Sequence, residues 1–125
     1  MARPLILVVE DDRGLRDLYR TSLGLAGFDV HVSEDGLNAL RYLEDHRPDL
    51  IVLDLDLPKI PGATLHSELR VHPRTRPIPV IVVTGMDPSP TLPGAVTLRK
   101  PCAPEVLIQA IERALRALRG PASPV

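Results

Sequence analysis

Acidic side chains come directly after two apolar segments of this sequence. Glu10 and Asp11 follow the apolar residues at 5–9, and Asp54 follows those at 50–53. If these carboxylates lie within about 4 Å of one another, each pair repels by several kcal/mol, so a cation is needed among them. Because the side chains offer only oxygen atoms, the cations that suit the group best are Mg²⁺ and Mn²⁺.

Two further polar side chains come after later apolar segments. Thr84 follows the run at 80–83, and Lys100 lies just past the run at 95–98. A hydroxyl and an ammonium beside acids and a divalent cation suit phosphoryl transfer, in which a protein mainly positions groups and neutralises the charge of the phosphoryl oxygens. A carboxylate can act as the nucleophile in such a reaction.

The elements that must bring these residues together are short. Strands are predicted at residues 5–9, 28–32, 50–53, 80–83 and 95–98. Helices are predicted at residues 12–26, 34–45, 62–71 and from 104 to about 120. The runs at 5–9 and 80–83 are apolar throughout rather than alternating, which indicates burial on both faces and hence a parallel sheet covered by helices.

This alternation predicts an α/β fold with a doubly wound, five-stranded parallel sheet in the flavodoxin-like order 2-1-3-4-5. In that order the first and third strands are neighbours, so Glu10, Asp11 and Asp54 converge at the carboxyl edge of the sheet. Thr84 and Lys100 end the fourth and fifth strands at the same edge.

Helix boundaries and buried faces are also predicted from the residue pattern. Ser33 is the candidate N-cap of the second helix, Gly27 the candidate residue beyond the end of the first, and Asp12 is assigned to capping or solvent. The spacing predicts these buried faces: Leu15, Leu18, Tyr19, Ser22 and Leu25 in the first helix, and Leu107, Ile111, Leu115 and Leu118 in the last.

The bulk composition limits the classes of function. At 125 residues the chain fits one domain, expected at 1–120 with a short flexible tail at 121–125. A formal net charge of −1 provides no field for nucleic acid or an anionic membrane. No apolar run approaches a membrane span or a secretory signal, which predicts a cytoplasmic protein. Cys102, the only cysteine, excludes an internal disulfide and is assigned to packing.

Four motifs hold the candidate site residues: VVEDD at 8–12, DLDLP at 54–58, VVTG at 82–85 and RKP at 99–101. By these motifs, and over residues 4 to about 119, the chain resembles the receiver domain of two-component response regulators. The resemblance implies that Asp54 takes a phosphoryl group from the phosphohistidine of a histidine kinase or a phosphotransfer protein. It implies a signalling domain rather than an enzyme, whose aspartyl phosphate alters the binding of an output protein that the sequence does not name.

The resemblance also implies roles for the remaining site residues. The implied ligands of Mg²⁺ are the side chains of Asp11 and Asp54, a water held by Glu10, and the main-chain carbonyl of Asp56. Thr84 and Lys100 would contact the phosphoryl oxygens. The peptide bond between Lys100 and Pro101 would be cis.

The sequence departs from the receiver pattern between the last two strands. Residues 85–95 include Pro88, Pro90 and Pro93, so we expect an extended loop where receivers place their fourth helix. Thr97 stands where receivers usually carry an aromatic residue that reorients on phosphorylation. These changes predict that output uses another face, that the phosphoryl group is passed onward, or that switching has been lost.

Charged residues around the motifs leave several readings open. The side chain of Asp56 faces either the metal side or solvent, and solvent is favoured. If it faced inward it would tighten Mg²⁺ binding but repel an incoming phosphate, with Lys59 partly offsetting its charge. The cluster of Arg70, Arg74 and Arg76 is interpreted as a solvated face or, less favoured, a surface for an acidic protein partner.

Two other functions remain as alternatives. One is a receiver-like interaction module that is not phosphorylated, against which the intact acid cluster counts. The other is a haloacid-dehalogenase-type phosphohydrolase with Asp54 as nucleophile and Asp56 as acid/base. Its family needs a metal-binding acid pair downstream of the nucleophile, whereas Glu10 and Asp11 lie upstream.

Overall fold

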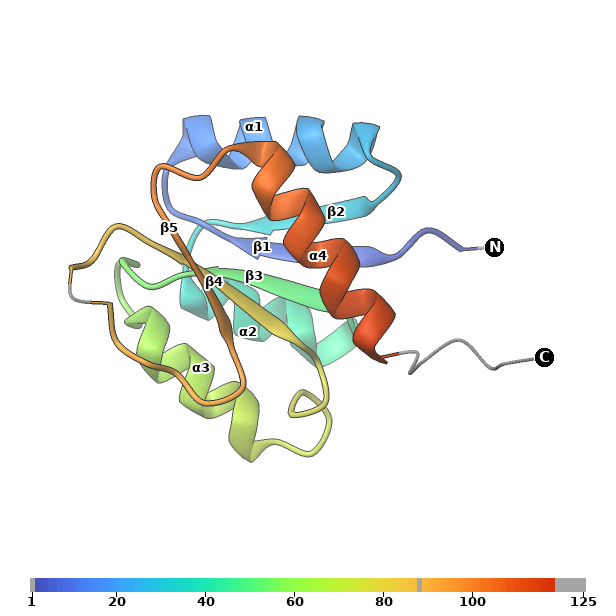
Figure 1. Ribbon diagram of the computed structural model, residues 1–125. Coiled ribbons are helices and arrows are strands. Elements are labelled where there is room, and N and C mark those ends of the chain that lie inside the picture. Colours follow the sequence, from blue (N-terminus) through green and yellow to red (C-terminus); the bar gives the residue numbers. More distant parts are fainter. Residues whose placement is uncertain (1, 88, 119–125) are drawn as a thin grey trace.

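The structure is a computed structural model that describes residues 2–87 and 89–118 (Figure 1). Its strands are β1 (Leu5–Val9), β2 (Asp29–Ser33), β3 (Leu50–Asp54), β4 (Val80–Thr84) and β5 (Val96–Arg99). Its helices are α1 (Arg13–Leu25), α2 (Gly36–Asp45), α3 (Gly62–Val71) and α4 (Pro104–Leu118). The predicted tail at 121–125 lies outside the described residues.

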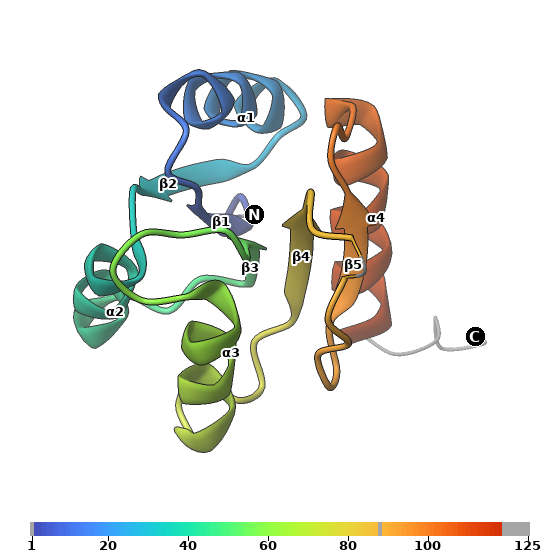
Figure 2. The ribbon, with the colours of Figure 1, turned by 90° about the vertical axis from the view of Figure 1, so that its left-hand side faces the viewer.

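The strands form one parallel sheet in the order β2-β1-β3-β4-β5, which confirms the predicted topology. Helices α1 and α4 cover one face, and α2 and α3 cover the other (Figure 2). Every residue of β3 and β4 is buried. Two aliphatic cores therefore sandwich the central strands, as the continuous apolar runs predicted.

Helix α1 fills the predicted range 12–26 except for its first and last residues, which are the caps Asp12 and Ala26, but the prediction of its buried face was partly wrong. The Oδ1 of Asp12 accepts a hydrogen bond from the backbone N–H of Leu15 at 2.8 Å, and Gly27 takes a positive φ of 102° just past the C-cap. Tyr19 and Leu23 are buried, whereas Leu18 and Leu25, both predicted to be buried, are 44% and 86% exposed. Two residues advance a helix by roughly 200°, so Leu25 points away from the sheet once Leu23 faces it.

The predicted cap of α2 and the predicted end of the α4 stripe were also wrong. Ser33 is the last residue of β2, paired in register with Val9. Asp35 caps α2 instead, because its Oδ1 accepts from the N–H of Asn38 at 2.8 Å. In α4, Leu118 is 59% exposed. With 15 residues α4 is longer than the five-residue strands beneath it, so its last turn passes beyond the sheet.

The connection from β4 to β5 contains no helix in its described residues, 85–87 and 89–95. Arg70 of α3 holds this segment from the side, because its Nη1 donates to the carbonyl of Pro93 at 3.0 Å. Strand β5 is an edge strand, and Val96 is 52% exposed. Among the described residues, none of the helices combines the length and the hydropathy that a bilayer span requires.

Candidate functional site

Three carboxylates meet at the carboxyl edge of the sheet, as the topology predicted. The register pairs Val9 with Leu53, so Glu10 and Asp54 follow at the same level on adjacent strands. One carboxylate oxygen from each of Glu10, Asp11 and Asp54 lies within 4.8 Å of the others. Glu10 and Asp54 are each 2% exposed, whereas Asp11 faces solvent. The cluster is therefore a buried acid pair with an exposed third acid at its mouth.

Lys100 brings the positive charge that the acid pair needs. Its backbone N–H donates to the carbonyl of Thr84 at 2.9 Å, which fixes it beside the end of β4. Its Nζ donates to Oε1 of Glu10 at 2.8 Å and lies 3.3 Å from Oδ2 of Asp54. One ammonium contacts two of the three carboxylates, so the described cluster is left with negative charge that a divalent cation would balance.

Burial and hydrogen bonding perturb the protonation of this cluster. Burial raises the pKa of Glu10 to about 7, although the hydrogen bonds from Lys100 and from the N–H of Asp12 oppose that rise. Proximity to Asp54 adds to it. Burial alone would lower the pKa of Lys100, but its hydrogen bond to Glu10 and the charge of Asp54 raise it above the ordinary value. Lys100 is therefore charged, and Glu10 changes its charge near neutral pH.

The two oxygens of Asp54 have different surroundings. Oδ1 accepts a hydrogen bond from the N–H of Asp56 at 3.0 Å. Oδ2 is buried and, within the described residues, accepts no hydrogen bond, since the contact with Lys100 is charge proximity alone. A buried carboxylate oxygen without a donor is costly. Together with the all-oxygen donor set, this orphaned atom fits a site for Mg²⁺ or for an incoming electrophile.

The remaining predicted site residues lie around this cluster. Thr84 is 1% exposed at the end of β4, and its Oγ1 accepts from the N–H of Met86 at 3.0 Å. Because the hydroxyl accepts there, its own proton is available for donation elsewhere. The peptide bond between Lys100 and Pro101 is cis.

Three side chains near the site point away from it. Asp56 is exposed, as expected. The expectation that Lys59 offsets its charge was wrong, because Lys59 Nζ lies 3.1 Å from Oδ2 of Asp35, the buried cap of α2. A carboxylate that is already buried holds a lysine better than one in solvent. Thr97 is exposed on β5 and pairs in register with Val82, so it faces the side covered by α2 and α3.

The sequence analysis missed Arg16, which holds the backbone of Glu10 and Asp11 in place. Its Nη1 donates to the main-chain carbonyls of Glu10 at 3.1 Å and Asp11 at 2.7 Å. These bonds fix the turn from β1 into α1 and so orient both acids. An arginine in the first turn of a helix carries no signal of this role, since it more often faces solvent.

Gly62 was also missed, and it fixes the turn that follows Asp54. A Cβ at this position would lie 2.4 Å from Cα of Leu55 and 2.5 Å from the carbonyl oxygen of Asp54. The N–H of Gly62 donates to the carbonyl of Leu55 at 3.1 Å. The start of α3 therefore packs against the end of β3 at a distance that only glycine permits. The Pro-Gly pair in the sequence was the available signal.

Comparison with known proteins agrees with this geometry. Residues 6–112 match the family described as response regulator receiver domain. Response regulator MprA of Mycobacterium sp. (strain KMS) is 35% identical over 128 residues, which cover 95% of this chain and 55% of that protein. The DNA-binding dual master transcriptional regulator RpaA of Synechocystis sp. is 41% identical over 83 residues, covering 66% of this chain and 34% of that protein. The chain thus spans about half or less of these curated relatives.

Solved structures show the same fold over nearly the whole chain. The signal receiver domain of a signal transduction histidine kinase from Syntrophus aciditrophicus has a TM-score of 0.84 and 30% identity, covering 98% of this chain and 97% of that one. A CheY-like response regulator receiver domain protein from Methanospirillum hungatei has a TM-score of 0.83 and 25% identity, covering 94% and 98%. Together with the acid cluster, these matches establish that the chain belongs to the response regulator receiver domain family.

Proposed function

We propose that Asp54 of this receiver domain accepts a phosphoryl group from the phosphohistidine of a histidine kinase or a phosphotransfer protein. The observation that carries this proposal is the buried Oδ2 of Asp54, which lacks a hydrogen-bond donor in the described structure and lies 3.3 Å from an ammonium. An oxygen in this position is screened from water and faces a positive charge. This suits a nucleophile, because the aspartyl phosphate that it forms carries more negative charge than the carboxylate and is stabilised by the ammonium.

The donor set supports Mg²⁺, with Mn²⁺ as a substitute. Asp11 and Asp54 would hold the ion by their carboxylates, Glu10 through a water, and Asp56 by its main-chain carbonyl. A bound Mg²⁺ supplies neutralisation of charge on the phosphoryl oxygens. The exposed position of Asp11 leaves the mouth of the cluster open to the donor protein.

The chain's own groups account for the transfer step. An oxygen of Asp54 forms a bond to phosphorus as the bond from phosphorus to the imidazole nitrogen breaks, and that nitrogen keeps the electron pair and later takes a proton. Lys100 keeps its charge and turns from Glu10 and Asp54 toward a phosphoryl oxygen. The hydroxyl of Thr84 donates its free proton to another phosphoryl oxygen.

The β4 to β5 connection bears on how the phosphorylated state is read. We propose that residues 85–95 form a loop in place of the helix that receivers usually carry at this point. With no ring at Thr97, an aromatic residue cannot report the movement of Thr84. The output protein then binds another face of this cytoplasmic domain, such as α1, and this domain makes no direct contact with nucleic acid.

Intact-mass analysis tests the proposal. The protein is incubated with Mg²⁺ and a small phosphodonor such as acetyl phosphate, and we expect one phosphoryl adduct per chain. Asp54→Asn should abolish it, whereas Asp45→Asn, an exposed acid at the end of α2, should not. Absence of an adduct on a folded protein that binds Mg²⁺ would refute the proposal and favour an interaction module that is not phosphorylated.

A further inference from the structure

A polar cavity lies at the opposite end of the strands from the acid cluster. Its volume is about 150 Å³, and it opens between α3, the turn that leads into β4, and Gly94 before β5. It touches Val80, the first residue of β4, whereas Thr84 of the acid cluster is the last. In Figure 1 the chain before β5 runs alongside α3, as the bond from Arg70 to Pro93 requires.

Positive charge lines this cavity without any acid to balance it. The lining residues are His66, Leu69, Arg70, Thr75, Arg76, Pro77, Ile78, Pro79, Val80 and Gly94. Two of them are arginines and none is Asp or Glu. Arg76 is exposed and makes no side-chain hydrogen bond or ion pair to the described residues. An unbalanced pair of guanidinium groups around a polar cavity is complementary to an anion.

His66 supplies an independent indication of a ligand. The residue is 3% exposed and lines the cavity. Its ring nitrogens make no hydrogen bond to residues 2–87 and 89–118, and they are not fully buried, because the one fully buried side-chain atom without a partner in that part of the chain is Oδ2 of Asp54. Burial lowers the pKa of His66, and the charge of Arg70 lowers it further, so the ring is neutral at neutral pH. A neutral imidazole that lines a polar cavity and bonds to no described residue can donate one hydrogen bond to a group that enters the cavity.

Arg70 is held in the wall of the cavity by close packing. Its Nη1 donates to the carbonyl of Pro93. Gly94 has a φ of 75°, and a Cβ there would lie 2.6 Å from that same Nη1. Glycine at this position therefore lets the guanidinium pass close to the loop, and the arginine's other donors remain available.

We infer that this cavity binds a small oxyanion, a carboxylate or a phosphate group, between Arg70, Arg76 and the ring of His66. At about 150 Å³ it is smaller than the roughly 300 Å³ at which pockets for drug-sized ligands begin, so it accepts the anionic group and little else. The planar fork of an arginine matches both kinds of oxyanion. A bound anion would join α3 to the loop before β5. This inference does not depend on phosphorylation of Asp54.

The test is a titration followed by NMR of the folded, metal-free protein in chelator, in which the acid cluster repels anions. Sodium phosphate and sodium acetate are added in separate arms at constant ionic strength, with chloride as the balancing ion. We expect saturable shifts of the Gly94 and Val80 amides and of the His66 ring protons. The pKa of His66 should rise when the anion binds, because the anion favours the imidazolium.

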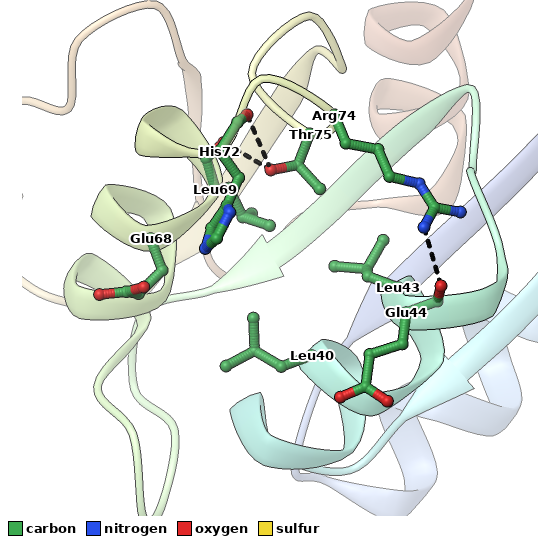
Figure 3. A pocket seen from close by; sticks show the side chains of 8 residues that line it. All are labelled: Leu40, Leu43, Glu44, Glu68, Leu69, His72, Arg74 and Thr75. Atoms are coloured by element: carbon green, nitrogen blue, oxygen red, sulfur yellow. Dashed lines mark hydrogen bonds between the residues drawn. The ribbon is translucent and has the colours of Figure 1, made fainter.

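Two arginine variants separate a site from general surface charge. Arg76→Gln should weaken binding about tenfold or more, the usual loss when one charge-assisted hydrogen bond is removed. Arg74→Gln is the matched control, since Arg74 donates to the carbonyl of Glu44 at 2.8 Å and lines a different pocket, between α2 and α3 (Figure 3). The Arg74→Gln variant should bind the anion within about twofold of the wild-type affinity, because solvent and salt screen the Arg74 charge from the cavity.

Each outcome of the titration decides the inference. Saturation by phosphate alone, or by acetate alone, supports it and identifies the class of anion. Shifts that match those produced by chloride overturn it, as does an equal loss of affinity in Arg76→Gln and Arg74→Gln. Phosphate shifts confined to Thr84 and Lys100 also overturn it, because the anion would then occupy the acid-cluster site.

Discussion

Replacing Asp54 by asparagine should stabilise the metal-free protein, because the carboxylate is held among like charges. The nearest oxygens of the cluster lie within 4.8 Å, and at an effective dielectric of about 20 a like-charged pair at that distance repels by roughly 3.5 kcal/mol. The repulsion from exposed Asp11 is closer to ~1 kcal/mol, because water screens it. Removing the buried charge on Oδ2, which accepts no hydrogen bond in the described structure, adds a further ~3 kcal/mol to the stability of the variant.

The attraction to Lys100 opposes these gains. At 3.3 Å it is worth roughly 5 kcal/mol on the same scale, and the substitution removes it. The net expectation is that the free energy of unfolding rises by about 2.5 kcal/mol, which for a chain of this length raises the melting temperature by roughly 5 to 10 °C. Asparagine keeps the Oδ1 that accepts from the N–H of Asp56, so the turn should stay intact.

The assay is thermal and urea unfolding of wild type and Asp54→Asn in chelator, about one pH unit above the pKa of Glu10 so that Glu10 is charged. Millimolar Mg²⁺ should narrow the difference, because it binds the wild-type cluster more tightly and stabilises the folded state by mass action. Asp45→Asn serves as the control for removing an exposed acid. A variant that melts at or below the wild type in chelator would refute the argument that crowded charge destabilises this site.

Three further predictions follow from the described contacts. Because the pKa of Glu10 is raised from 4.5 to about 7 in the folded state, the metal-free protein should lose up to about 3 kcal/mol of stability as pH rises through that window. Glu10→Gln should remove that slope, and calorimetry should detect proton release when Mg²⁺ binds near neutral pH. Gly62→Ala should cost roughly 1–3 kcal/mol in urea unfolding, because its Cβ collides with β3 backbone; Gly24→Ala, with nothing within 4 Å of the added atom, should be neutral or stabilising. Leu23→Ala should cost about 2–5 kcal/mol, whereas Leu25→Ala should change stability by less than about 0.5 kcal/mol.

The sequence was sufficient to predict the topology and the meeting of the acids, for a physical reason. Short apolar runs that end in acids leave few ways to bury the runs while the acids stay at an edge of the core, and the parallel sheet satisfies both because it gathers the acids at its carboxyl edge. Glu10 and Asp54 therefore came together as predicted. Long side chains were less predictable, because Lys59 and Arg16 each reach several positions and their partners depend on the turns around them.

The apolar spacing correctly predicted that the helices have one buried face, but it did not always identify which residues form that face. In α1 the apolar residues Leu18, Leu23 and Leu25 allow more than one stripe, and the sheet selects the one that includes Tyr19 and Leu23. The N-cap of α2 likewise depends on a feature that the local sequence does not determine, the residue at which β2 ends. Ser33 and Asp35 are both good N-caps, and extension of β2 through Ser33 left the role to Asp35.

Arg16 connects α1 to the acidic turn through the backbone. Among the described residues its guanidinium forms no ion pair with the carboxylates of the cluster. A single nitrogen of Arg16, Nη1, donates hydrogen bonds to the main-chain carbonyls of both Glu10 and Asp11. A protein that binds α1 and rotates it by a few degrees would move that turn, and with it both the buried Glu10 and the exposed Asp11 at the mouth of the site. A displacement of the outer surface of this helix would thus be transmitted to the acid cluster through one side chain. The strength of the two Arg16 hydrogen bonds would then set the coupling between a protein bound on α1 and a cation bound at the proposed site.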